Sequence, residues 1–181
     1  MTDSERVAGP GAGAALPTDP PDTPAIRAAA AAGIPYRVVR TERPHHAEES
    51  AGLQGIQLRA LLRTIVVRRG QDDYVMVLVP GGRRFDWPKL RTYLGVSRLS
   101  LPDKDEAREA TGYERGTITP FGSARAWPVI LDASAAGLER VSIGGGAFGV
   151  NLHLAPADLV AATGATVADV TAPETASDAT G

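Results

Sequence analysis

The stretch LLRTIVVRRGQDDYVMVLV, residues 61–79, carries a clear signal for β structure in this chain. Its two halves, residues 61–68 and 74–79, are rich in β-branched and apolar side chains. Between them, Gly70-Gln71-Asp72-Asp73 has the composition of a turn. Two such runs joined by a short glycine-containing segment predict a β-hairpin whose strands pair antiparallel.

Arg63 is a charged residue inside the first of these strands. On an alternating strand it shares a face with Ile65 and Val67, while Thr64 lies on the other face. Both faces are largely apolar, and an isolated buried charge is costly. We therefore expect Arg63 to lie at the mouth of a cavity or in an ion pair. The alternative is an arginine at a frayed strand start that reaches solvent.

Helix and strand signals alternate irregularly around the hairpin. Asp86 and Asp103 are candidate helix N-caps, and Gly95 and Gly112 are the corresponding stops. The predicted helices are residues 24–32, 47–53, 86–94, 103–111 and a last one from residue 156, and the further predicted strands are residues 36–41, 127–131, 138–142, 149–154 and 167–170. Many short strands interleaved with helices predict an α+β domain with a mixed, curved sheet.

Composition limits the possible functions. A chain of 181 residues with 43% hydrophobic content can form one domain, which we place at residues 23–171. Nineteen Lys and Arg against twenty-one Asp and Glu argue against a protein that grips long DNA through many phosphates, so a nucleic-acid partner would be touched locally. The absence of cysteine excludes disulfides, thiolate metal sites and a cysteine nucleophile. No apolar run approaches a membrane span.

The two ends have a different composition from the rest. Residues 1–22 are rich in Gly, Ala, Pro and acidic residues and lack the charged and apolar regions of a secretory signal. We expect disorder there. The last residues, 172–181, are small and polar, and we expect them to be flexible because they offer little apolar area to offset the entropy of ordering.

Residues 112–122, GYERGTITPFG, interrupt the helix and strand patterns with three glycines and a proline. Glycine allows close backbone approach and proline fixes the exit direction, so this segment can present backbone N–H and C=O groups to a ligand. A plain structural turn is the alternative.

A second glycine cluster, residues 142–149 (SIGGGAFG), follows a predicted strand. It lacks the Lys-Ser/Thr ending of a P-loop, which argues against ATP hydrolysis and leaves a wide hairpin or a pocket wall. On the strand that follows it, Asn151 and His153 share one face, which could line a pocket.

Three other possible sites have weak support. His45 and His46 are adjacent, and neighbouring side chains on an extended chain point in opposite directions, so we expect no metal there. A Ser142, His153 and Asp158 triad lacks the Gly-x-Ser-x-Gly elbow. The basic run at residues 82–91 is most simply a solvated loop and helix face, with a phosphate contact as the alternative.

Taken with its flanks, the glycine-rich segment at residues 112–122 resembles the Gly-x-x-x-Pro loop of the YbaK/ProX/EbsC family. The members of this family are free-standing relatives of the editing domain inserted in bacterial prolyl-tRNA synthetases. Gly116 and Pro120 would be its fixed points. Further matches lie in order along the chain: TPAI (23–26), LRTIVV (62–67), DWPKL (86–90), VSIGG (141–145) and LAPADL (154–159). This resemblance implies a barrel-like mixed sheet flanked by helices.

The resemblance also implies a function: a cytoplasmic, trans-acting aminoacyl-tRNA deacylase without a cofactor or metal, whose partners are the charged tRNA acceptor end and an aminoacyl-tRNA synthetase. Gly116 would shape the site, and Arg63 stands where the family usually carries a lysine. Arginine keeps the charge but cannot transfer a proton near neutrality. A non-catalytic binding module of the same fold therefore stays open. The implied pocket residues are Thr64, Pro120, Ser142, Gly144, Gly145, Asn151 and His153.

Overall fold

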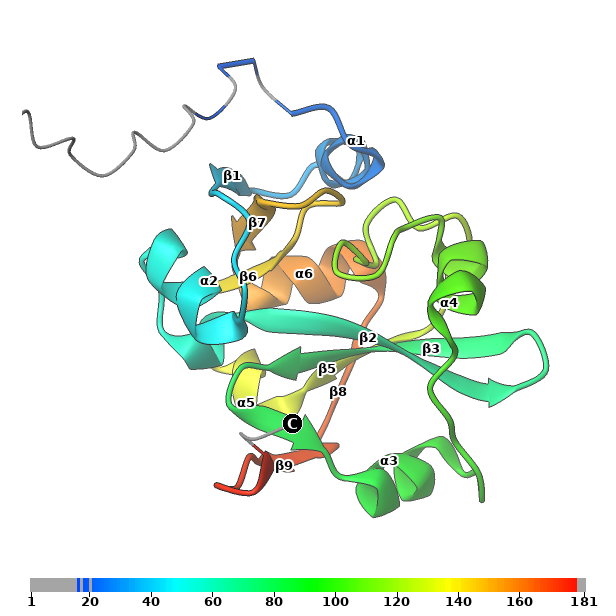
Figure 1. Cartoon of the computed structure of the whole chain (residues 1–181). Helices are drawn as coiled ribbons and strands as arrows, with labels where there is room; N and C mark the ends of the chain where they lie inside the picture. The colour runs from blue at the N-terminus through cyan, green and yellow to red at the C-terminus, as the bar shows by residue number, and fades with distance from the viewer. Residues whose placement is uncertain (1–15, 17, 20, 179–181) are drawn as a thin grey trace, which may run out of the picture.

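A computed structural model describes residues 16, 18, 19 and 21–178 (Figure 1). Its main sheet has the order β2-β3-β5-β8. The predicted hairpin is confirmed: β2 (Leu62–Gly70) pairs antiparallel with β3 (Asp73–Pro80). β5 (Val129–Asp132) and β8 (Thr166–Ala168) continue the sheet with parallel pairing. β2 is thus an edge strand of this sheet.

Two smaller sheets complete the β structure. β1 (Arg37–Arg40), β7 (Val150–Leu154) and β6 (Val141–Gly144) form an antiparallel sheet in the order β1-β7-β6. β4 (Arg83–Phe85) pairs antiparallel with β9 (Thr171–Pro173). The α+β class and the mixed sheet are confirmed, while the described strands form three sheets and not one closed barrel.

The helices surround these sheets (Figure 1). Asp86 and Asp103 cap α3 and α4 by accepting backbone N–H groups, and Gly95 and Gly112 end them in the left-handed conformation, as predicted. The helical elements are α1 (Pro24–Ala31), α2 (Ala47–Gln54), η1 (Leu58–Ala60), α3 (Trp87–Leu94), α4 (Lys104–Thr111), α5 (Ala133–Ala136) and α6 (Pro156–Thr163). None of the described helices is long and apolar enough to cross a membrane.

The C-terminal part differs from the sequence prediction. Residues 83–84 were expected in a solvated loop, yet they belong to β4, which β9 covers. One strand was predicted at residues 167–170. The structure instead has two short strands, β8 at residues 166–168 and β9 at residues 171–173. Beyond β9 the Glu174 N–H bonds the Gly82 carbonyl and Asp178 pairs with Arg84. Contacts therefore continue past the boundary predicted at residue 171. Most of the N-terminal segment predicted to be disordered lies outside the described residues.

The two faces of the hairpin belong to different apolar clusters. Leu62 and Leu78 pack in a cluster that also contains residues of β6, β7 and α6. Val67, Val77 and Val79, on the opposite face, pack with α3 and β5. Burial on both faces explains why both faces of these strands are apolar in sequence.

α4 is attached to the hairpin by a polar cluster. Arg68 Nη1 donates to both carboxylate oxygens of Glu106 at 2.8 Å, and the Tyr74 hydroxyl donates to Glu106 Oε1 at 2.6 Å. The hydrogen bond to Glu106 is the largest cause that raises the pKa of Tyr74 to about 12. The cluster fixes the helix from which the glycine loop at residues 112–122 leaves.

That loop is held at both ends by direct contacts. The buried Tyr113 hydroxyl donates to the Phe121 carbonyl across the loop at 2.7 Å, and burial raises the pKa of Tyr113. Gly122 has a φ of +66°, and a Cβ there would lie 2.4 Å from the Pro24 carbonyl oxygen. Glycine is therefore required for the loop to rest on the start of α1.

We predict that Gly122→Ala destabilises the fold by at least about 2 kcal/mol, because it adds a clash to a left-handed backbone. Gly137→Ala is the control, since a Cβ at Gly137 meets nothing within 4 Å and its φ is −90°. Urea unfolding should separate the two variants. Equal midpoints would contradict the required contact between loop and helix.

Candidate functional site

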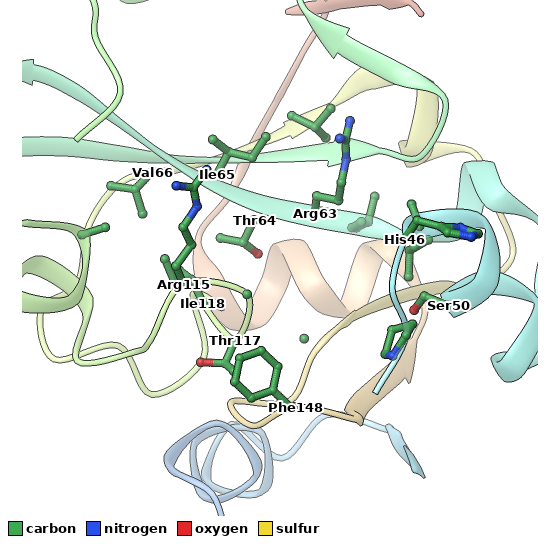
Figure 2. Close-up of a pocket in the computed structure, with 18 of the residues that line it drawn as sticks. His46, Ser50, Arg63, Thr64, Ile65, Val66, Arg115, Thr117, Ile118 and Phe148 are labelled. Atoms are coloured by element: carbon green, nitrogen blue, oxygen red, sulfur yellow. The ribbon is translucent and has the colours of Figure 1, made fainter. Parts of the chain in front are cut away.

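A cavity of about 750 Å³ lies beside β2 (Figure 2). Its walls are Leu61 and residues 62–66 of β2, the start of α2, loop residues 115–118 and the turn at residues 147–151. β4 and Glu174 close one end. The two glycine segments thus meet the predicted hairpin at one place, and the volume suits a small ligand.

Arg63 and Thr64 leave β2 in opposite directions (Figure 2). The Arg63 Nη2 donates to the Arg83 carbonyl and lies 3.6 Å from Glu174 Oε1. Its Nε is buried without a partner in the described structure. Arg63 is therefore both at the cavity and paired, which combines the two placements expected from the sequence.

Thr64 points toward the side of the cavity formed by Thr117 and Phe148 (Figure 2). Its Oγ1 is buried and has no hydrogen-bond partner within the described part of the chain. Most buried polar atoms are satisfied, so this unpaired hydroxyl is an exception at the cavity wall, although protein atoms cover the oxygen itself.

Gly116 and Phe148 form the wall opposite β2. Gly116 has a φ of +94°, and a Cβ there would approach the Phe148 ring at 3.0 Å. The Arg43 guanidinium carbon lies 3.8 Å from the centroid of the same ring, which is 37% exposed. Gly116 thus allows the loop to pack on an aromatic ring that a cation also contacts.

Arg115 is a site residue that the sequence interpretation missed. It lines the cavity beside Gly116, and Figure 2 shows its side chain extending from the loop toward β2. Its place inside the glycine loop was the signal that could have identified it. The cavity is locally basic although the chain carries a net charge of −2, because its lining includes Arg43, Arg63, Arg84, Lys104 and Arg115 against Asp103 and Glu174.

Two other basic residues of the 82–91 run, Arg83 and Lys89, are engaged elsewhere. Arg83 Nε donates to Thr171 Oγ1 at 2.6 Å, and Lys89 pairs with Asp169 at 3.0 Å. Arg84 lines the cavity and also pairs with Asp178 at 3.0 Å, so it stays a candidate phosphate contact through its position and not because it lacks a partner.

Four of the predicted pocket residues do not line the cavity. Ser142 and His153 are 0% and 3% exposed and both contact Gln54, with Ser142 Oγ donating to Gln54 Oε1 at 2.6 Å and His153 Nε2 lying 2.9 Å from the same oxygen. Gly145 and Pro120 also lie outside the lining, whereas Gly116, Thr64, Gly144 and Asn151 belong to it.

The geometry also argues against a serine triad. Ser142 and His153 share an acceptor on Gln54 and do not bond each other in the described structure. Because the Gln54 oxygen accepts, His153 carries its proton on Nε2 and its buried Nδ1 has no partner there. Burial, followed by the nearby Arg37 and Arg140, lowers the pKa of His153. His153 is thus a neutral core residue.

The adjacent histidines serve the start of α2. His46 Nδ1 accepts the Glu49 N–H at 3.2 Å, and the His45 N–H donates to Glu49 Oε2 at 2.6 Å. This is a reciprocal helix cap. Among the described residues no group of three or more His, Cys, Asp or Glu side chains is placed to hold a metal ion.

Comparison with known proteins identifies the family. Residues 41–162 match the aminoacyl-tRNA editing domain, and this range contains β2, both glycine segments and most of the cavity lining. The chain belongs to the aminoacyl-tRNA editing domain family. The resemblance drawn from the sequence motifs is confirmed.

Individual relatives agree with this membership. The chain is 25% identical to the "Putative Cys-tRNA(Pro)/Cys-tRNA(Cys) deacylase EbsC" of Enterococcus faecalis over 77% of this chain and 85% of the relative. It is 29% identical to the proline–tRNA ligase of Thermosipho melanesiensis over 60% of this chain, but it spans only 19% of that ligase.

Solved structures show the same fold. A crystal structure described as that of a "putative trans-editing enzyme for prolyl tRNA synthetase" matches with a TM-score of 0.68 and 29% identity, over 77% of this chain and 87% of that one. The crystal structure of a hypothetical protein matches with a TM-score of 0.76 and 26% identity, over 83% of this chain and all of that one.

We predict that Gln54→Leu destabilises the fold by about 2–4 kcal/mol, because it leaves the buried Ser142 and His153 donors without an acceptor. Gln71→Leu, at the exposed hairpin turn, is the matched control and should change stability by less than about 0.5 kcal/mol. Denaturant unfolding measures both. A Gln54→Leu variant as stable as the control would contradict the role of the network.

Stability should also fall on mild acidification because of His153. Its folded pKa lies below the ordinary value of 6.5, so the unfolded chain binds the proton more tightly. The free energy of unfolding should therefore decrease as the pH drops below 6.5, by up to about 1.4 kcal/mol per pH unit. His153→Gln should flatten the profile from pH ~7 to ~5. His45→Gln, at an exposed site, is the control and should show the same dependence of the free energy of unfolding on pH as the parent. If His153→Gln also kept that pH dependence, the assignment to His153 would be wrong.

Proposed function

We propose that the protein is a trans-acting aminoacyl-tRNA deacylase that hydrolyses the ester joining a wrong, small amino acid to the 3′ end of tRNA(Pro) or a related tRNA. The main support for this proposal is the cavity beside β2, whose lining is locally basic although the chain carries a net charge of −2. A cavity of about 750 Å³ with cations at its walls fits one aminoacyl group and the terminal nucleotide next to phosphates.

The reaction needs little more than positioning. Water attacks the ester carbonyl carbon, the bond from that carbon to the ribose oxygen breaks, and a proton from the water passes to that oxygen. An aminoacyl ester is already activated, so oriented water and stabilisation of the oxyanion by N–H groups and a cation can suffice. Steric exclusion by the cavity walls would keep the correct amino acid out.

The residues divide as follows in this proposal. Gly116 and its loop hold the terminal ribose, and Arg115 and Arg43 lie where phosphates would approach the cavity. Arg63 supplies positive charge from the end of β2, and Thr64 forms part of the cavity wall beside it. The partners are the charged tRNA acceptor end and an aminoacyl-tRNA synthetase, which places the activity in the cytoplasm.

A non-catalytic module that holds a charged tRNA end is the second candidate. The observation that favours it is Arg63, whose guanidinium already contacts the Arg83 carbonyl and Glu174. A guanidinium that already contacts protein acceptors stabilises the negative charge developing on the ester carbonyl oxygen less than an unpaired guanidinium does.

We expect catalytic amounts of the protein to release amino acid from at least one member of a panel of mischarged tRNAs that includes alanyl- and cysteinyl-tRNA(Pro). Arg115→Ala should lower kcat/KM roughly 10-fold, since one charge-assisted contact is lost. Arg98→Ala, an exposed arginine outside the cavity lining, is the matched control.

Failure to release amino acid from any tRNA of the panel, combined with retained binding of charged tRNA, would replace the deacylase by the binding module. Arg63→Ala is assayed beside the other variants. If it hydrolyses as fast as the parent, Arg63 has no part in the reaction, and the family membership is unaffected.

A further inference from the structure

The outer edge of β2 is unpaired between two anchor points. At its C-terminal end, Arg68 and Ser100 exchange backbone hydrogen bonds of 2.8 and 3.2 Å. At its N-terminal end, Leu61 forms a bridge with Ser142 of β6. Between these points β3 is the only described strand that pairs with β2, and it occupies the inner edge.

The register shows which residues direct their backbone groups outward. In an antiparallel pair, successive residues bond alternately toward the partner and away from it. Leu61 bonds inward, since its carbonyl accepts the Gly81 N–H at 2.8 Å, and Arg68 bonds outward to Ser100. No bulge interrupts the register from Leu62 to Arg68. Thr64 and Val66 therefore turn their N–H and C=O groups outward.

Two residues of β3 confirm this alternation. Met76, opposite Val66, donates its N–H to Pro128 on the far side of β3. Pro80, opposite Leu62, has no N–H to give to β2. Both positions fit pairs that are not hydrogen-bonded across β2 and β3.

The outward groups open into the cavity. Six consecutive residues, 61–66, line it, including side chains from both faces of β2, as expected for a cavity that runs along the strand edge. No described strand forms a ladder with Thr64 or Val66 on this outer side, and none of the turn, loop or cap hydrogen bonds of the described residues involves their backbone groups. An unpaired edge beside a cavity is a template for an extended ligand.

We propose that the backbone of Thr64 binds the α-aminoacyl group of the substrate as one residue of an antiparallel pair. The Thr64 N–H donates to the ester carbonyl oxygen, and the Thr64 carbonyl accepts the α-ammonium group. This inference rests on the proposed function and names the part of the substrate that this edge recognises. Thr64 is chosen over Val66 because its side chain faces Thr117 and Phe148 across the cavity (Figure 2).

The pairing fits the chemistry of the ligand. An α-aminoacyl ester carries one donor nitrogen and one acceptor carbonyl on the same residue, which complements one outward residue of an antiparallel edge. An N–H aimed at the carbonyl oxygen also stabilises the negative charge that develops there when water attacks. The backbone contacts are independent of the amino acid side chain, so choice among amino acids falls to the cavity walls.

The first test uses the unaltered protein with one tRNA carrying alanine, lactic acid or N-acetylalanine. Lactic acid replaces the ammonium by a neutral hydroxyl, and N-acetylation removes the charge and adds bulk. Each rate is divided by the spontaneous hydrolysis rate of the same ester. We expect kcat/KM to fall at least roughly 10-fold for both analogues, because a charge-assisted hydrogen bond is lost.

The second test replaces Thr64 by its α-hydroxy acid analogue, which exchanges the backbone N–H for an ester oxygen and keeps the side chain. We expect a fall in kcat of roughly 10-fold or more with an unchanged unfolding midpoint. The same exchange at exposed Ser97, whose N–H has no partner in the described structure, is the matched control and should leave the rate unchanged.

The outcomes are distinguishable. If alanine is released and both analogues are hydrolysed equally well, the Thr64 pairing is wrong and the deacylase function stands. An unchanged kcat in the Thr64 backbone variant overturns the contact to the carbonyl oxygen. If that variant does not fold, the substrate series still decides, and if no ester is hydrolysed at all, the proposed function fails together with this inference.

Discussion

The pairing of β2 along one edge only is the constraint on which the site depends. β3 takes the inner edge, and apolar clusters bury both faces, so the position of β2 is fixed without a second neighbour. Ser142 and Ser100 hold its two ends on the outer side. The backbone groups between them are left for a ligand, because β2 is too well buried to shift and pair elsewhere.

The remaining walls are positioned against this edge by close glycine contacts and by buried polar side chains. Gly116 reaches the Phe148 ring, and the Tyr113 hydroxyl and Gly122 fix the loop from within and from α1. The polar cluster of Arg68, Tyr74 and Glu106 holds the helix before the loop. The site is thus built mostly from backbone, with the positive charge supplied by the arginines around it.

Local signals in the sequence predicted much of this fold. The hairpin follows from its own composition and turn, and the helix ends follow from capping residues, because both are determined within a few residues. The pairing of β4 with β9 joins segments 88 residues apart and leaves no local signal. Likewise, alternation placed Asn151 and His153 on one face, but only the packing of Gln54 over that face shows that His153 belongs to the core.

Arg63 shows how tertiary contacts change the reading of a motif residue. The strand sequence left open a cavity mouth, an ion pair or a strand start that reaches solvent. The direction of the Arg63 side chain depends on Arg83 and Glu174, which the strand itself does not specify. A guanidinium that keeps these acceptors cannot also reach across β2 to a carbonyl on the Thr64 side. In the proposed pairing, the Thr64 N–H stabilises the oxyanion there together with N–H groups of the Gly116 loop, and Arg63 contributes positive charge only from a distance.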